Sequence, residues 1–188
     1  SQNPETGMTT YFQSLLTGAF KVRGAYNKIR SLSEEERARG VIACSAGNHA
    51  QGIALSATKL GIRSVVCMPA AAPISKIHAT ENYGAEVVLV PGVYDDAYAN
   101  ALELRDKHGY TFVHPFDDEL VIAVQGTIGL EIIEQLPDVE AVIVPIGGGG
   151  LISGVAVALK TLRPDIKIYG VQAAGAPSME VSVKEKKI

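Results

Sequence analysis

Short apolar segments alternate with helix-like segments along this chain, and this alternation constrains the fold more than any other feature. The predicted strands are residues 40–44, 63–68, 86–90, 110–113, 141–144 and 166–172. The predicted helices cover residues 31–39, before the first strand, and 48–60, 75–83, 95–108, 120–136 and 151–162, between the strands. Most of the strands are continuously apolar, as burial on both faces of a parallel sheet requires. The sequence therefore predicts an α/β fold with helix-covered parallel sheets.

The glycine turn, Gly147–Gly150, is the most unusual connection between a strand and a helix. Four consecutive glycines cost backbone entropy that a plain tight turn, the alternative interpretation, does not need. Their N–H groups at the start of a helix favour a phosphate group. The next strand ends in Gln172 rather than in an acidic residue, which argues against a dinucleotide fingerprint.

A second loop of small residues, Ser45–Gly52, also leads from a strand into a helix. Its backbone N–H groups would face an anion such as a carboxylate. Asn48 has two interpretations, a helix N-cap or a hydrogen-bond partner of a cofactor oxygen. His49 is interpreted as a structural histidine rather than a general base.

Lys21 lies between Phe20 and Val22, in the segment Thr17–Ala25 that leads into a helix. A surface lysine whose stem packs on its neighbours is the common alternative. An amine that loses water has a lowered pKa and can condense with a carbonyl group. Such an amine and a phosphate site together predict a phosphorylated aldehyde cofactor, which is pyridoxal phosphate (PLP).

Composition excludes several functional classes. The 188 residues carry a net charge of −3 with mixed signs, which gives no footprint for nucleic acid or for an anionic membrane. No apolar run approaches the ~18 residues of a membrane span. Cys44 and Cys67 lie in apolar segments and are expected to be buried, reduced thiols of a cytoplasmic protein. The histidines show no metal-ligand spacing, and no metal is expected. Gly126 inside a helical pattern predicts a close approach to the backbone.

The three segments Thr17–Ala25, Ser45–Gly52 and Gly147–Gly150, in this order, resemble fold-type II PLP enzymes of the threonine/serine dehydratase group. Within that group the resemblance is closest to the catabolic threonine dehydratases. It implies a two-lobe fold similar to the β subunit of tryptophan synthase. Residues 38–122 would form the small open α/β lobe. Residues 1–37 and 123–188 would form part of the larger PLP-binding lobe, which is expected to be incomplete because the family continues for about one more domain.

The resemblance also implies roles for individual residues. Lys21 would bind PLP covalently and act as acid and base at the substrate Cα, with Phe20 beside the cofactor ring and Asn48 on its hydroxyl. The phosphate would lie on Gly147, Gly148, Gly149, Gly150 and Leu151. The substrate carboxylate would lie on Ser45, Ala46, Gly47 and His49.

The implied activity is PLP-dependent dehydration of L-threonine or L-serine to a 2-oxo acid and ammonia. A serine racemase-like enzyme, a β-replacement enzyme and an inactive truncated fragment of a dehydratase are the alternatives. Racemases of this group carry a second acid/base serine where this sequence has Ala46, and cation-binding carboxylates where it has Gln172 and Ser178. These differences favour elimination and argue against a metal. The resemblance further implies a homodimer or homotetramer and a possible nucleotide monophosphate effector.

Overall fold

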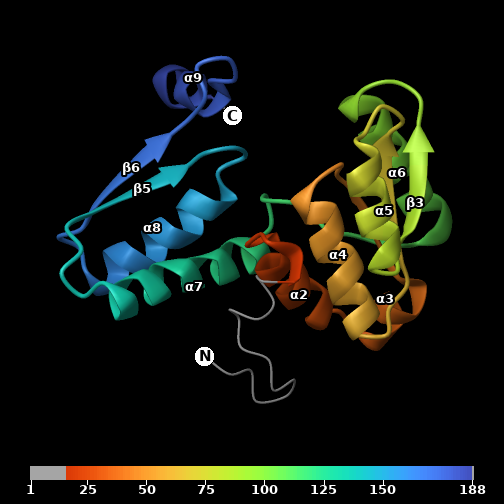
Figure 1. Cartoon of the computed structure of the whole chain (residues 1–188), viewed down its shortest axis with the longest axis horizontal. Coiled ribbons are helices and arrows are strands. Elements are labelled where there is room, and N and C mark those ends of the chain that lie inside the picture. The colour runs from red at the N-terminus through yellow and green to blue at the C-terminus, as the bar shows by residue number, and fades with distance from the viewer. Residues whose placement is uncertain (1–15, 188) are drawn as a thin grey trace. The chain divides into compact units, whose positions relative to one another are not determined.

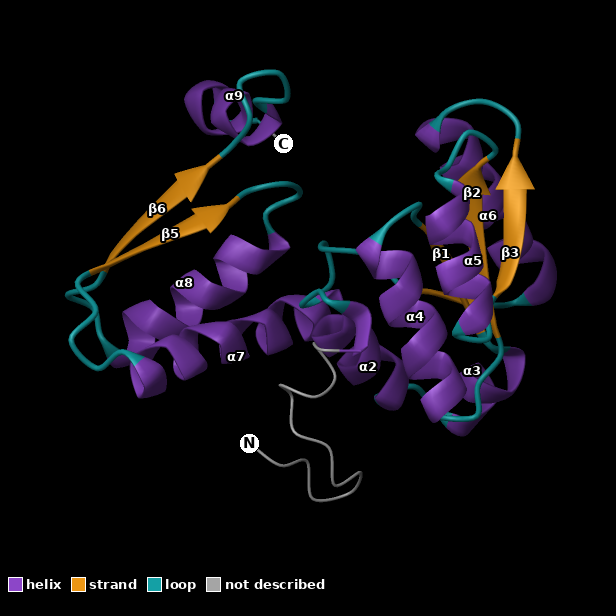
Figure 2. Cartoon of the chain, viewed as in Figure 1, coloured by secondary structure: helices purple, strands orange, loops and turns teal. Residues whose placement is uncertain are grey.

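The computed structural model describes residues 16–187, so predictions for residues 1–15 and 188 lie outside the described part. Contacts divide the chain into two compact units at Pro115 and Phe116. The first unit contains α2 (Lys21–Arg30), α3 (Glu34–Arg39), β1 (Val41–Cys44), α4 (Asn48–Lys59), β2 (Ser64–Pro69), α5 (Ile74–Asn82), β3 (Glu86–Val90), α6 (Tyr94–His108) and β4 (Thr111–Phe112) (Figure 1). The second unit contains α7 (Glu119–Gln135), β5 (Ala141–Pro145), α8 (Gly150–Leu162), β6 (Lys167–Val171) and α9 (Ser178–Glu185) (Figure 2).

The first unit is built on a four-stranded sheet in the order β3-β2-β1-β4, and all of its strand pairs are parallel. Side chains alternate between the two faces of each strand. Val41 and Ala43 of β1 pack in one core with α2 and α4, whereas Ile42 and Cys44 pack in a second core with α6. The predicted burial of strands on both faces is therefore confirmed for the central strands β1 and β2, whereas the edge strands β3 and β4 are only partly buried.

The two cysteines are register partners on β1 and β2, and both are free and fully buried, as predicted. Loss of water on burial raises the pKa of Cys44 and of Cys67 to about 11. The thiols are consequently protonated and act as small apolar side chains.

Local sequence signals determine where several helices begin and end. Ser33 and Glu36 form a capping box at the start of α3, where each side chain accepts from the backbone N–H of the other residue. Asp118 caps α7 by accepting from two backbone N–H groups. Gly109 ends α6 with a left-handed backbone, φ 72°, which a residue with a Cβ adopts at a cost.

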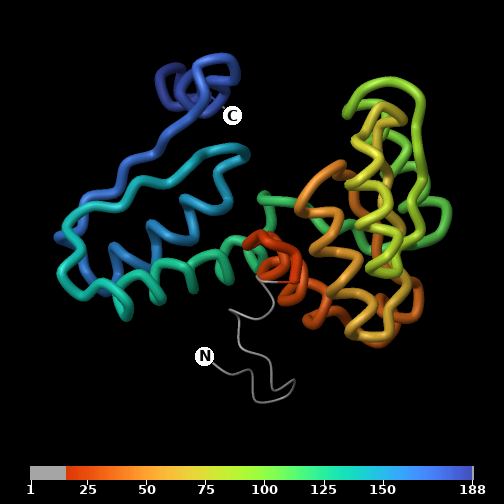
Figure 3. Tube along the Cα trace, in the orientation of Figure 1, coloured from red at the N-terminus to blue at the C-terminus, as the bar shows by residue number. Residues whose placement is uncertain are grey.

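The second unit packs α7 and α8 together and places a two-stranded parallel sheet, β5-β6, on α8 (Figure 3). The two helices meet at glycines. A Cβ on Gly126 would lie 2.9 Å from the Gly154 carbonyl oxygen, and a Cβ on Gly154 would lie 2.7 Å from the Gly126 nitrogen. The close approach that the sequence predicts at Gly126 is therefore the contact with α8.

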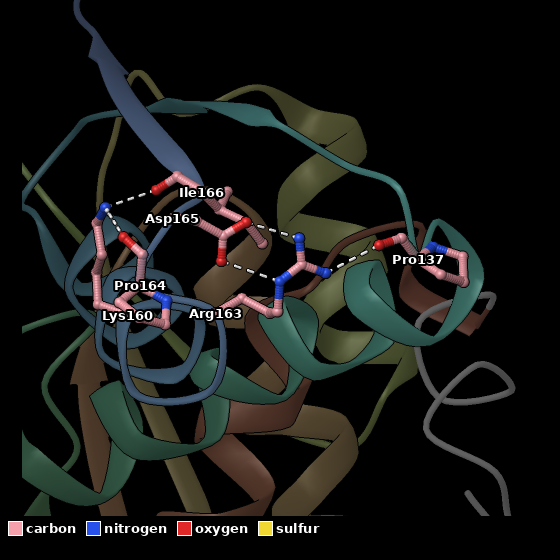
Figure 4. A network of polar contacts seen from close by, with 6 residues as sticks. All are labelled: Pro137, Lys160, Arg163, Pro164, Asp165 and Ile166. Atoms are coloured by element: carbon pink, nitrogen blue, oxygen red, sulfur yellow. Dashed lines mark hydrogen bonds and ion pairs between the residues drawn. The ribbon is translucent and has the colours of Figure 1, made fainter.

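A polar network joins the end of α8 to the start of β6 and to the end of α7 (Figure 4). The Arg163 guanidinium donates to both carboxylate oxygens of Asp165, at 3.0 and 2.7 Å, and to the Pro137 carbonyl oxygen at 2.9 Å. The Lys160 ammonium donates to the carbonyl oxygens of Pro164 and Ile166. The cationic side chains of Arg163 and Lys160 thus donate to backbone carbonyl oxygens just beyond the C-terminal ends of α7 and α8. Positive charge is favourable there because the C-terminal end of a helix is the negative end of its dipole.

Two features of the second unit differ from the sequence prediction. The outer face of β5 is uncovered by the described residues, since Ile143 is 69% exposed, whereas the apolar run predicts burial on both faces. The short helix α9 is absent from the prediction because its first turn is capped by the distant Gln172 rather than by a residue at its own start.

The predicted lobe boundaries remain a prediction. Contacts join α2 to α4 within the first unit, with the Val22 Cα only 3.2 Å from the position of a Cβ on Gly52. The sequence analysis assigns residues 1–37 to the larger lobe, and this chain is expected to contain only part of that lobe. Contacts among the described residues cannot include the rest of that lobe, so the assignment of residues 1–37 stays a prediction.

The α7–α8 contact predicts that Gly154→Ala destabilises the protein. The new methyl group would overlap the Ile122 carbonyl oxygen and crowd the Gly126 amide, both of them backbone atoms of α7. We expect a loss of about 1–3 kcal/mol in the free energy of unfolding, measured by urea denaturation. Gly175→Ala is the matched control, because a Cβ there meets nothing within 4 Å. Equal stability of the two variants would contradict the proposed close helix contact.

Candidate functional site

Lys21 is the first residue of α2, and its side chain is partly buried. The Nζ atom donates a hydrogen bond to the Pro115 carbonyl oxygen at 2.7 Å and lies 5.5 Å from the centroid of the Phe20 ring. Loss of water on burial lowers the pKa of the Lys21 amine. The structure therefore gives this lysine a defined hydrogen-bond partner and a pKa below its usual range, unlike a freely solvated surface lysine.

Packing of α2 against α4 fixes the backbone from which Lys21 projects. Val22 and Ala25 are buried in α2, and Gly52 of α4 lies close to the Val22 backbone. A Cβ on Gly52 would lie 3.2 Å from the Val22 Cα and 3.3 Å from the Lys21 carbonyl carbon. The glycine in the Ser45–Gly52 segment thus permits the helix contact that positions the lysine.

The Ser45–His49 segment connects β1 to α4. Ser45 donates its N–H to the Cys67 carbonyl oxygen, and its hydroxyl oxygen accepts the Gly47 N–H at 3.3 Å. Gly47 occupies the N-cap position of α4, so the interpretation of Asn48 as the N-cap is wrong. Asn48 is instead the first helical residue, and its exposed Oδ1 accepts from the Lys76 ammonium at 3.4 Å. The N–H groups of the first turn of α4 lack acceptors within the helix and favour an anion.

His49 is buried, and its Nε2 lies 2.9 Å from the Val113 carbonyl oxygen. Burial lowers the pKa of His49 to about 4, the hydrogen bond to Val113 opposes this change, and the nearby Lys21 charge adds to it. The His49 ring is therefore neutral at neutral pH, and its Nε2–H donates to the Val113 carbonyl oxygen. Burial and this hydrogen bond favour the interpretation of His49 as a structural histidine, which stays a prediction.

The segment after β4 is a part of the site that the sequence analysis missed. It supplies the carbonyl oxygens of Val113 to His49 and of Pro115 to Lys21. A contact with a backbone carbonyl leaves no signature in the residue types, so the sequence held no signal for either bond.

The glycine turn follows β5 and leads into α8. Gly149 is the N-cap residue of α8 with φ 90°, and Gly150 is its first residue, followed by Leu151 in the first turn. A Cβ on Gly150 would lie 2.7 Å from the Phe116 carbonyl oxygen, and one on Gly148 would overlap the Phe116 ring. A Cβ on Gly147 would meet nothing within 4 Å. The turn is thus packed on Phe116 and has open space at Gly147, as a phosphate site at a helix start requires.

The structure places the predicted residues in two groups. Phe20, Lys21, Ser45, Ala46, Gly47, Asn48 and His49 belong to the first unit, and Gly147, Gly148, Gly149, Gly150 and Leu151 belong to the second. Lys21 of the first group contacts Pro115, and the glycine turn of the second group contacts Phe116. Each group therefore has a contact with one of two residues that are consecutive in the chain. Joint use of both groups by one cofactor stays a prediction.

The chain matches the profile of a known family over residues 10–188, and the description of that family is pyridoxal-phosphate dependent enzyme. It is 60% identical over 168 residues to L-threonine ammonia-lyase of Thermotoga maritima. It is 54% identical over 166 residues to catabolic L-threonine dehydratase TdcB of Escherichia coli. The structure of processed threonine deaminase isoform 2 from Solanum lycopersicum matches with a TM-score of 0.88 and 48% identity.

These matches span most of this chain but only about half of the similar proteins. They cover 89% of this chain and 42% of the Thermotoga protein, and 88% of this chain and 50% of the Escherichia protein. For the tomato structure the shares are 91% and 47%.

The environment of His49 predicts a pH dependence of stability. Its pKa is about 4 in the folded chain and 6.5 as the reference value, so the unfolded chain binds more protons between these values. Stability from this group is present above pH 6.5 and is lost as the pH falls towards 4, by roughly 3 kcal/mol at most. We expect His49→Gln to be less sensitive than the wild type over this range in urea unfolding. NMR titration of His49 near pH 6.5 would contradict the assignment.

Proposed function

Because the chain belongs to the family of pyridoxal-phosphate dependent enzymes, we propose that it catalyses the PLP-dependent dehydration of L-threonine or L-serine. The products are a 2-oxo acid and ammonia. The observation that carries the proposal is the partly buried Lys21 amine, which has a lowered pKa and an ordered contact with Pro115. The names of two similar proteins, threonine ammonia-lyase and threonine dehydratase, support the choice of substrate.

The residues present fit PLP. The glycine turn lies at the start of a thirteen-residue helix, α8, whose unpaired N–H groups suit the cofactor phosphate. Phe116 packs against Gly148 and Gly150, whereas the space beside Gly147 is open and would be available to the phosphate. Lys21 supplies the amine that the cofactor aldehyde requires. Phe20, 5.5 Å from that amine, would lie beside the cofactor ring.

Each group of this chain has a proposed part in the reaction. Bound PLP would accept the electron pair of the broken Cα–H bond. The Lys21 amine would take the Cα proton, and burial, which lowers its pKa, favours the neutral form that accepts a proton. The segment Ser45–His49, which leads into the first turn of α4, would hold the substrate carboxylate at the N–H groups of the helix start. Asn48 is exposed beside this turn and would hydrogen-bond the cofactor hydroxyl.

The proposed reaction balances without an oxidant or reductant. The Cα–H bond and the Cβ–O bond break, and the hydroxyl group leaves with a proton as water. The resulting enamine takes up one water and releases ammonia and the 2-oxo acid. Ala46 has no side-chain acid or base, so the chain offers at that position no group to return a proton to the opposite face of Cα.

The assignment of Lys21 predicts that Lys21→Ala loses the visible absorbance that PLP gains when it binds a lysine. Turnover of L-threonine should fall by more than about 100-fold, because the acid/base group is absent. Borohydride treatment of the wild type, followed by peptide mapping, should place the reduced cofactor on Lys21. Lys59→Ala, a change of an exposed lysine at the end of α4, is the control and should behave like the wild type. Retained absorbance and turnover in Lys21→Ala would overturn the assignment.

Product analysis separates the proposed reaction from the alternatives. A dehydratase gives mainly 2-oxo acid from L-serine or L-threonine, a racemase gives D-serine, and a β-replacement enzyme gives a new amino acid only with an added nucleophile. Binding of PLP without any product would favour a non-catalytic fragment.

We further propose that the protein is a cytoplasmic homodimer or homotetramer that responds to a nucleotide monophosphate. No described helix is long and apolar enough to cross a membrane, and both thiols are free and buried. Sedimentation measures the oligomeric state. A ligand that binds only the folded protein raises its thermal midpoint, so we expect AMP or CMP to raise the midpoint. An unchanged midpoint at saturating nucleotide would remove the effector from the proposal.

A further inference from the structure

Gln172 lies at the same edge of the β5-β6 sheet as the glycine turn, yet it belongs to none of the proposed cofactor contacts. Gln172 directly follows β6, and its side chain reaches the first turn of α9. Its Oε1 accepts from the Met179 N–H at 3.1 Å and from the Glu180 N–H at 3.2 Å, and its Nε2 donates to the Ser178 hydroxyl at 3.2 Å. Pro177 at the N-cap of α9 supplies no side-chain hydrogen bond. Gln172 therefore caps this helix from outside.

Packing contributes little to the position of α9. None of its residues is buried, and Val183 is 70% exposed. A cavity of about 500 Å³ lies beside it, lined in part by Ile146, Val171 and Val183. The ion pair between Lys184 and Glu180 lies within the helix and does not join it to the sheet. The hydrogen bonds of Gln172 are thus the main polar link between β6 and α9 in the described chain.

The start of α9 covers one residue of the glycine turn. A Cβ on Gly149 would lie 2.9 Å from the Met179 Cε, whereas Gly148 and Gly150 are covered by Phe116. Gly149 has φ 90° and determines how the chain enters α8. Met179 therefore contacts the residue whose backbone directs the first N–H groups of α8.

The pairing of β5 and β6 brings Gln172 and the turn to the same sheet edge. Pro145 pairs with Val171, and the Ile146 N–H donates to the Val171 carbonyl oxygen at 2.8 Å. Gln172 and Gly147 are the next residues of their respective segments.

We propose that Gln172 is a positioning residue for the phosphate site. It caps α9, holds Met179 against Gly149 and so keeps the N–H groups of the glycine turn in the arrangement that receives the phosphate. This inference rests on the proposed function, because it concerns the same PLP phosphate. Gln172 itself does not touch the cofactor.

Titration of the full chain with two forms of the cofactor tests this inference. We expect Gln172→Ala to bind PLP about five- to tenfold more weakly, the size of effect that loss of a helix cap has. Binding of pyridoxal, which lacks the phosphate, should be unchanged. Met179→Ala should weaken PLP binding in the same selective way without removing the cap. Gln172→Glu keeps an acceptor for both N–H groups and should retain wild-type affinity, as should Lys184→Ala, which removes only the ion pair within α9.

Amide hydrogen exchange without cofactor supplies the second readout. Exchange at residues 147–151 and 178–181 should accelerate by about the same factor in Gln172→Ala and not in Gln172→Glu. Unchanged exchange at the turn in Gln172→Ala would overturn the inference, and so would equal weakening of PLP and pyridoxal binding. Absence of PLP binding in the wild type would instead refute the proposed function, while the exchange data would still show whether Gln172 holds the turn.

Discussion

Parallel strand pairing is the constraint on which the rest of this structure depends. Parallel strands require a crossover helix between them, so each connection from a strand to a helix lies at the carboxyl edge of its sheet. In the first unit this edge carries Ser45–His49, and in the second it carries the glycine turn and Gln172. Within each sheet, residues distant in sequence thereby reach the same edge, where helix starts offer N–H groups to anions.

Exclusion of water lowers the pKa of two side chains of the candidate site in the first unit, Lys21 and His49. Burial lowers the pKa of both Lys21 and His49, because each loses hydration that favours its charged form. Both side chains then find carbonyl oxygens on the short segment after β4. A neutral imidazole near the lysine adds no second positive charge beside the Lys21 amine.

The glycine turn combines backbone freedom with a fixed position. Its conformation needs glycine at Gly149, where φ is 90°, and its packing needs glycine at Gly148 and Gly150, where Phe116 leaves no room for a Cβ. Only the first of these reasons can be inferred from the sequence. The second depends on Phe116, which comes from a segment about thirty residues earlier and has no local signal that marks it as a partner of the turn.

The sequence by itself determined the α/β class, the parallel sheets, most helix ends and the three segments that resemble PLP enzymes, because periodicity, caps and glycines act locally. Tertiary structure alone decided the carbonyl partners of Lys21 and His49, the N-cap role of Gly47 in place of Asn48, and the existence of α9. These depend on contacts with backbone atoms or with distant side chains, such as Gln172 on α9. A backbone carbonyl is the same in every residue, so only the folded chain determines which one a side chain meets.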